Sequence, residues 1–139
     1  MKYKKVEKDY IVKLQRGEEV TAAFTKFADE VKLGSGFVIG VGAICDVELG
    51  YFEMKTKEYL HRKFDGEYEL INLTGNFSIV DGKRFFHAHI VISDREFRAF
   101  AGHLFSGVIA VTGEFFVTAS SVEIAREPDN ETGLNLLEL

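Results

Sequence analysis

Three of the four histidines lie in one stretch whose spacing can hold a metal ion. His87 and His89 stand two residues apart in Phe85–Ile92, a run of aromatic and β-branched residues after an Asp-Gly turn pair that predicts a β-strand. Side chains two apart on a strand point to the same face, so the two imidazoles project together, with Cα atoms about 6–7 Å apart. His103 follows after a short polar connection, beside a glycine that permits close backbone approach or a sharp turn. The spacing predicts a three-histidine metal site.

Zinc is the expected ion, and another divalent transition metal would accept the same ligands. Neutral imidazole binds zinc at about 2.0–2.1 Å, and three protein ligands with an open fourth position are typical of catalytic zinc. Glu48 and Glu114 are candidate carboxylates near such a site, but their spacing assigns neither of them. The alternative is that the histidines bind backbone carbonyls or lie at a subunit interface, and the residues alone leave both open.

The other motifs with chemical side chains are weaker. His61 has no second ligand at metal spacing, which favours a surface or hydrogen-bonded histidine. A Ser-His-Asp arrangement can be drawn from Ser93, Asp94 and His103, but no nucleophile-elbow sequence accompanies them. The glycines between residues 34 and 42 do not form a dinucleotide fingerprint, because the third glycine is missing and the segment precedes a strand.

One helix and a series of strands must position these side chains. Apolar residues recur at helical spacing from Val20 to Val31, after acidic residues that complement the helix dipole. A glycine follows that is available for a left-handed cap. Alternating and β-branched patterns separated by short turns predict the strands. Residues 1–16 contain one or two of them, and the others are expected at 37–44, 47–54, 59–64, 68–80, 84–93, 106–113 and 114–125.

This order of elements predicts an α+β fold, a mostly antiparallel β-sheet or barrel-like sandwich with one main helix packed on it. At 139 residues the chain is expected to form a single domain, residues 1–139, with a core that needs no disulfides or structural metals. We expect that core at about residues 8–126, followed by a C-terminal tail over 127–139. The leucines of the tail either dock on the body or on a neighbour, or the tail is disordered.

Charge and cysteine content restrict the partners. The chain has 17 Lys+Arg against 22 Asp+Glu and a net charge of −5, which disfavours binding to a phosphate backbone. The amino-terminal lysines at positions 2, 4, 5 and 8 are better explained as a solvated end or as protection of an edge strand. A single cysteine, Cys45, and the lack of a signal pattern or membrane-spanning run predict a cytoplasmic protein with no membrane partner.

The apolar supply is large for a small protein. Hydrophobic residues make up 46% of the chain, and 13 of them are phenylalanines. Such a chain has either a dense core or an apolar surface that a partner subunit covers, so we expect a homo-oligomer.

Several segments together resemble the plants-and-prokaryotes conserved (PPC) domain. They are Gly17-Glu18 before the helix, then GFVIGVGAICDVELGYF, EYELINLTGNFSIVDGKRFFHAHIVISD and AGHLFSGVIAVTGEFFVTA. The resemblance covers roughly residues 8–126 and implies an antiparallel sheet with a packed helix and assembly as a homotrimer. It also implies a metal site of the His-x-His plus Gly-His type, and His87, His89 and His103 occupy those positions.

The resemblance leaves three functions to compare. The first is a trimeric ligand- or partner-binding module with the three-histidine zinc site, and the second is a metal-dependent enzyme acting on a small oxygenated substrate. The fold is also similar to that of acetolactate decarboxylase, a zinc enzyme, but similarity of fold assigns no reaction. The third is DNA binding, which plant relatives perform with an attached AT-hook; this chain has no such Arg-Gly-Arg-Pro segment.

Overall fold

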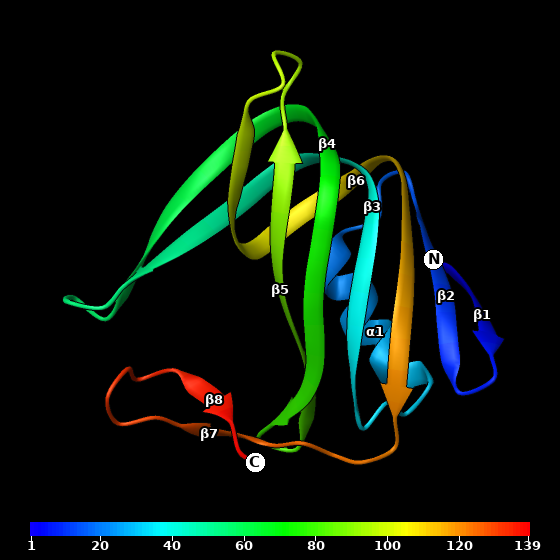
Figure 1. The fold of residues 1–139 in the computed structure, drawn as a ribbon, viewed down its shortest axis with the longest axis vertical. Helices are drawn as coiled ribbons and strands as arrows, with labels where there is room; N and C mark the ends of the chain where they lie inside the picture. The colour runs from blue at the N-terminus through cyan, green and yellow to red at the C-terminus, as the bar shows by residue number, and fades with distance from the viewer.

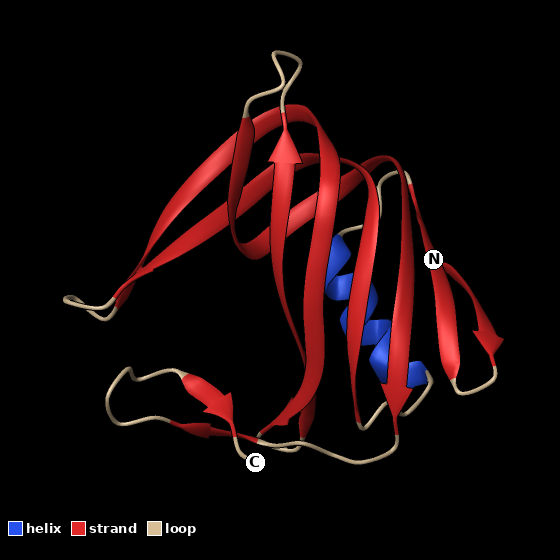
Figure 2. Cartoon of the chain, in the orientation of Figure 1, coloured by secondary structure: helices blue, strands red, loops and turns tan.

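The computed structural model describes residues 1–139 as one curved sheet, one helix and a small C-terminal hairpin (Figure 1). Figure 2 shows the single helix lying against the sheet. The elements in chain order are β1 (Lys2–Val6), β2 (Asp9–Gln15), α1 (Val20–Glu30), β3 (Ser35–Glu53), β4 (Glu58–Val80), β5 (Lys83–Ser93), β6 (Ala99–Ser120), β7 (Arg126–Pro128) and β8 (Asn135–Leu137).

The sheet is antiparallel throughout. Its six strands lie in the order β1-β2-β6-β3-β4-β5, and β6 also pairs with β5. This additional pairing closes β3, β4, β5 and β6 into a barrel-like ring, and β1 and β2 extend one edge. The predicted α+β fold, a mostly antiparallel sheet with one packed helix, is confirmed.

The strands are longer than the sequence patterns predicted. β3 continues through Asp46, where φ is 51° and the register with β4 shifts, and β4 continues through Gly66, where φ is 84°. β6 likewise joins two predicted strands and begins earlier, at Ala99. The predicted strand ends were wrong here because a β-bulge holds a residue outside the ladder without ending the strand. The long strands let β3, β4 and β6 bend over the core.

The helix begins and ends through side-chain and backbone capping. The Glu19 carboxylate accepts hydrogen bonds from the backbone N–H groups of Thr21 (3.0 Å) and Ala22 (2.6 Å), which otherwise lack helical partners. At the other end Lys32, and not the expected glycine, has the left-handed conformation, with φ of 53°. Val20, Phe24, Phe27 and Ala28 form the buried face, as the spacing predicted.

Phe24 lies at the centre of the core. Its ring is fully buried and packs edge-on against Phe27, Phe77 and Phe115, and it lies 4.8 Å from the ring centroid of Phe86. Phe86 immediately precedes His87 on β5, so the packing of this cluster also fixes the strand that carries the histidines. Aromatic contacts therefore anchor the helix to β4, β5 and β6.

We expect Phe24→Ala to lower the free energy of unfolding by about 3–5 kcal/mol, because it removes a buried ring and leaves a cavity among four others. Urea denaturation followed by circular dichroism measures the change. Phe97→Ala is the control, since that ring is 91% exposed and should change stability by less than about 0.5 kcal/mol. Equal effects of the two substitutions would contradict the assignment of Phe24 to the core.

The tail is ordered as a C-terminal hairpin, residues 126–137, formed by β7 and β8. One backbone hydrogen bond connects the segment before the hairpin with β4, from the Ile79 N–H to the Ile124 carbonyl (2.9 Å). A second joins the two ends of the hairpin region, from the Glu138 N–H to the Ala125 carbonyl (3.0 Å). In Figure 1 the hairpin extends to the left from near the lower ends of β4 and β5. Of the alternatives for the tail, the structure shows docking on the body. The chain contains no helix with the length and apolar character that crossing a membrane requires.

Candidate metal centre

The strand register brings the three histidines together. On β5 the buried residues alternate with Phe85, His87 and His89, which all point to the outer face of the sheet, as the period of a strand requires. His103 is the direct partner of His89 in the β5–β6 ladder. His103 therefore lies within β6, and the loop expected just before it is instead the turn between Ser93 and Ala99.

The distances suit one ion. One ligand atom of each histidine lies within 4.8 Å of those of the other two. The ring centroids are 5.2 Å apart for His87 and His89, 5.0 Å for His87 and His103, and 5.4 Å for His89 and His103. Zinc–nitrogen bonds of about 2.0–2.1 Å require the three ligand nitrogens to lie closer to one another than this. Rotation of the histidine side chains can bring them together. The three imidazoles can converge on a shared point.

The cluster favours neutral imidazole, the form that binds metal. Burial lowers the pKa of His87 to about 4, and the nearby His103 and Arg126 lower it in the same direction. Burial, with His89 and Arg126, lowers the pKa of His103 to about 4 as well. The pKa of His89 is lowered by burial alone. The Nδ1 atom of His103 is buried with no hydrogen-bond partner. A metal ion bound to this nitrogen would supply the missing partner.

These shifts predict how the metal-free protein responds to pH. The folded-state pKa values of about 4 for His87 and His103 lie below the ordinary histidine value of 6.5. Between these values the unfolded chain binds more protons, so the contribution of both histidines to stability is full above pH 6.5 and is lost as the pH falls towards 4. Urea denaturation in the presence of a chelator should show this loss for the wild type and a smaller loss for H87Q/H103Q. Parallel pH profiles for the two proteins would contradict the shifted pKa values.

Glycines let the strands around the cluster approach closely. A Cβ atom on Gly50 would lie 2.3 Å from a ring carbon of Phe105 and 2.8 Å from one of Tyr59. A Cβ on Gly102 would lie 2.9 Å from the carbonyl oxygen of Gly50. The close approach predicted beside His103 is thus confirmed, and it allows the rings of Tyr59 and Phe105 to pack within 5.2 and 4.8 Å of the His103 ring.

Arg126 is a site residue that sequence reasoning missed. Its Nη2 atom lies 3.4 Å from Nδ1 of His87 and donates to the Asn76 side-chain oxygen at 2.9 Å. Its Nε donates to Ser78 Oγ (2.8 Å), and Nη1 donates to the carbonyl of Asn135 (2.9 Å). No sequence signal marks Arg126, because the chain returns to the histidines only through the C-terminal hairpin.

A cavity of about 310 Å³ separates the histidines from that hairpin. His87 and His103 line it together with Arg126 and residues 133–136 of the hairpin. Tyr59 and Phe85 complete the lining. The cavity gives a small molecule access to the histidine cluster.

The remaining candidates lie outside the cluster. Glu48 accepts a 2.8 Å contact from Nδ1 of His61, which confirms His61 as a hydrogen-bonded histidine. Glu114 is exposed opposite Lys13 and Val41. Asp94 binds Arg98 and the backbone of its own turn, so the structure does not form a Ser-His-Asp triad. Only the three histidines meet.

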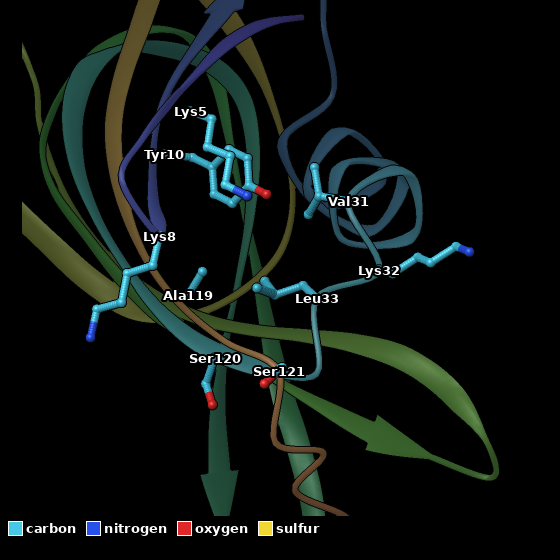
Figure 3. Close-up of a pocket in the computed structure, with 9 residues that line it drawn as sticks. All are labelled: Lys5, Lys8, Tyr10, Val31, Lys32, Leu33, Ala119, Ser120 and Ser121. Atoms are coloured by element: carbon cyan, nitrogen blue, oxygen red, sulfur yellow. The ribbon is translucent and has the colours of Figure 1, made fainter.

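A second cavity, of about 440 Å³, lies at the end of α1. Lys5, Lys8 and Lys32 lie at its rim, together with Tyr10 and Ser120 (Figure 3). In Figure 3 the Lys8 and Lys32 side chains point away from the cavity and from each other, and Lys5 lies over the Tyr10 ring. β1 is an edge strand and carries Lys2, Lys4 and Lys5, whereas Lys8 lies in the turn between β1 and β2.

Comparison with known proteins relates the chain to one family. The family model described as the Plants and Prokaryotes Conserved (PCC) domain matches residues 1–121. The chain is also 30% identical over 127 residues to the bifunctional protein GlmU of Synechococcus sp. (strain JA-3-3Ab), a match to 89% of this chain. It spans only 19% of the length of that curated relative.

Three solved structures share the whole fold. A candidate DNA-binding protein of Bacteroides thetaiotaomicron is 36% identical with a TM-score of 0.95, covering 99% of this chain and 96% of that one. A plant- and prokaryote-conserved protein of Pyrococcus horikoshii is 31% identical with a TM-score of 0.88, covering 99% and 94%. A metal-containing protein of Archaeoglobus fulgidus is 27% identical with a TM-score of 0.88, covering 100% of both chains.

Proposed function

As the chain belongs to the Plants and Prokaryotes Conserved domain family, we propose that it is a homotrimeric ligand-binding protein whose centre is one zinc ion held by His87, His89 and His103. The observation that carries the proposal is the convergence of three mostly neutral imidazoles, including a buried Nδ1 atom without a partner. The Archaeoglobus fulgidus relative, which is described as metal-containing, supports the same interpretation.

The donor set suits zinc or another divalent transition metal. Three imidazole nitrogens leave a coordination position for water or a ligand, and bound zinc would polarise an oxygen placed there. The cavity beside His87 and His103 gives that position access to solvent. Its lining supplies no carboxylate that could act as a general base, and we therefore place ligand binding before catalysis on a small oxygenated substrate.

An exposed apolar surface supports the homotrimer. We define the apolar face as the outward side chains of Ile11, Phe37, Ile39, Val41 and Phe116 on β2, β3 and β6, each at least 41% exposed. Ile11, Phe116 and Ile39 are successive cross-strand partners, so they form one continuous row. Contiguous exposed apolar patches mark interaction surfaces, and a copy of the chain is the occupant that the family resemblance implies.

The metal proposal is tested by adding zinc to protein stripped with a chelator. We expect one zinc ion per chain by elemental analysis and a rise in melting temperature with zinc concentration, because an ion that binds only the folded state stabilises it by mass action. Magnesium is the control, since it prefers oxygen ligands. A stripped protein that takes up no zinc, or that melts at the same temperature with and without it, would contradict the proposal.

DNA binding is a second candidate, favoured by the description of the Bacteroides thetaiotaomicron relative and by the lysines at the cavity of Figure 3. The net charge of −5 opposes it. Fluorescence anisotropy with an AT-rich duplex at low and physiological salt decides the matter. Binding that a K5E/K8E variant loses would support DNA as a partner, and no complex at low salt would exclude it.

A further inference from the structure

We propose that the cavity between the histidine cluster and the C-terminal hairpin binds a small aliphatic carboxylate, with Arg126 recognising the carboxylate group. The inference rests on the proposed metal site and names the chemical class of its ligand. It also assigns ligand specificity to residues 126–137, which lie beyond residues 1–121 that the family model matches.

The charge of the cavity calls for an anion. Arg126 is the only charged side chain in the lining. The four groups within hydrogen-bonding reach of its guanidinium are neutral: the Ser78 hydroxyl, the Asn76 amide oxygen, the Asn135 carbonyl and a ring nitrogen of His87. Neutral imidazoles add no negative charge, so a divalent ion beside Arg126 would leave about three positive charges uncompensated. An anionic ligand removes this imbalance.

The hydrogen bonds of Arg126 also hold its position. Nε is fixed by Ser78 of β4, and Nη1 by Asn135 of the hairpin. The guanidinium is planar and carries five N–H donors, so donor capacity remains for a ligand. A guanidinium oriented beside metal ligands is pre-organised to bind a carboxylate oxygen.

The rest of the lining indicates an apolar substituent. Phe85, Leu134 and Leu136 line the cavity, and the Arg126 guanidinium lies 5.4 Å from the centroid of the Phe85 ring. The volume of about 310 Å³ is at the small end of the range for ligand pockets. A short aliphatic carboxylate matches both features, whereas inorganic phosphate would leave the apolar walls without a partner.

Calorimetric titration of the zinc-loaded protein with isovalerate tests the inference, with isovaleramide as its uncharged analogue and inorganic phosphate as the competing anion. We expect isovalerate to bind more tightly than either. Arg126→Met should weaken isovalerate binding by at least about tenfold, the effect of losing a charge-assisted contact, and should leave isovaleramide binding within about twofold. Arg98→Met is the matched control, because Arg98 is an arginine that pairs with Asp94 and does not line the cavity; it should change isovalerate affinity by less than about twofold.

Each other outcome overturns the inference. These outcomes are no isovalerate binding, tighter binding of phosphate, and equal weakening of isovalerate and isovaleramide by Arg126→Met, which would show that the arginine only holds the hairpin in place. Equal effects of Arg126→Met and Arg98→Met would show that the loss of affinity does not depend on the arginine of the cavity. Elemental analysis of each sample separates the two proposals. Absent zinc overturns the proposed function and this inference together, and bound zinc with an unaffected Arg126→Met variant overturns this inference alone.

Discussion

Replacing His103 by alanine is expected to reduce bound zinc from one ion per chain to less than about one tenth. In the proposed site His103 would supply one of three nitrogens, and His103 is the cross-strand partner of His89 that completes the cluster. Changes to residues that only orient metal ligands already cost about 10–100-fold in metal affinity, so loss of a ligand itself should cost at least as much. Elemental analysis after dialysis against low zinc measures the stoichiometry.

His61→Ala is the matched control for this experiment. His61 stacks on Phe105, 4.3 Å between centroids, and contacts Glu48, but it does not belong to the three-histidine cluster. It should therefore keep one zinc ion per chain. Full zinc binding by His103→Ala, or equal loss in both variants, would contradict the assigned ligand set.

Replacing Phe116 by glutamate is expected to convert the proposed homotrimer into monomers. The Phe116 side chain is 64% exposed, and it lies between Ile11 and Ile39 in the apolar face. If a second copy covers this face, the substitution buries an unpaired carboxylate in each interface, which costs several kcal/mol per contact. Sedimentation equilibrium should show three times the 15.7 kDa mass of one chain for the wild type and a single chain for the variant.

Val122→Glu is the control for surface charge, because Val122 is equally exposed, at 64%, and lies outside the apolar face. It should remain trimeric. A monomeric wild type would contradict the homotrimer itself, and a trimeric Phe116→Glu variant would contradict the use of the apolar face as its interface.

The histidine cluster could be predicted because its geometry is local. Side chains two residues apart on a strand point to the same face, and this rule placed His87 and His89 together without knowledge of the fold. His103 was predicted less directly, since the sequence placed it after a loop and the structure places it in β6 as the partner of His89. Arg126 could not be predicted, because its position depends on how the C-terminal hairpin docks on β4.

The fold was predicted by class but not by strand length. Alternation of apolar residues identified most strands, and helical spacing identified α1. The predicted break between the strands at 37–44 and 47–54 was wrong, because Asp46 lies at a bulge within one continuous strand. The pairing of β5 with β6 depends on how far the long strands bend. A local sequence pattern does not encode that bend, so this pairing could not be predicted.

Anomalous diffraction at the zinc absorption edge, from crystals of the zinc-loaded protein, tests the central claim most directly. The proposal predicts one strong peak per chain within bonding distance of nitrogens from His87, His89 and His103. It also predicts a non-histidine ligand that approaches from the cavity bounded by Arg126. A peak at other side chains, or no peak in crystals of a protein shown to contain zinc, would contradict the three-histidine metal centre.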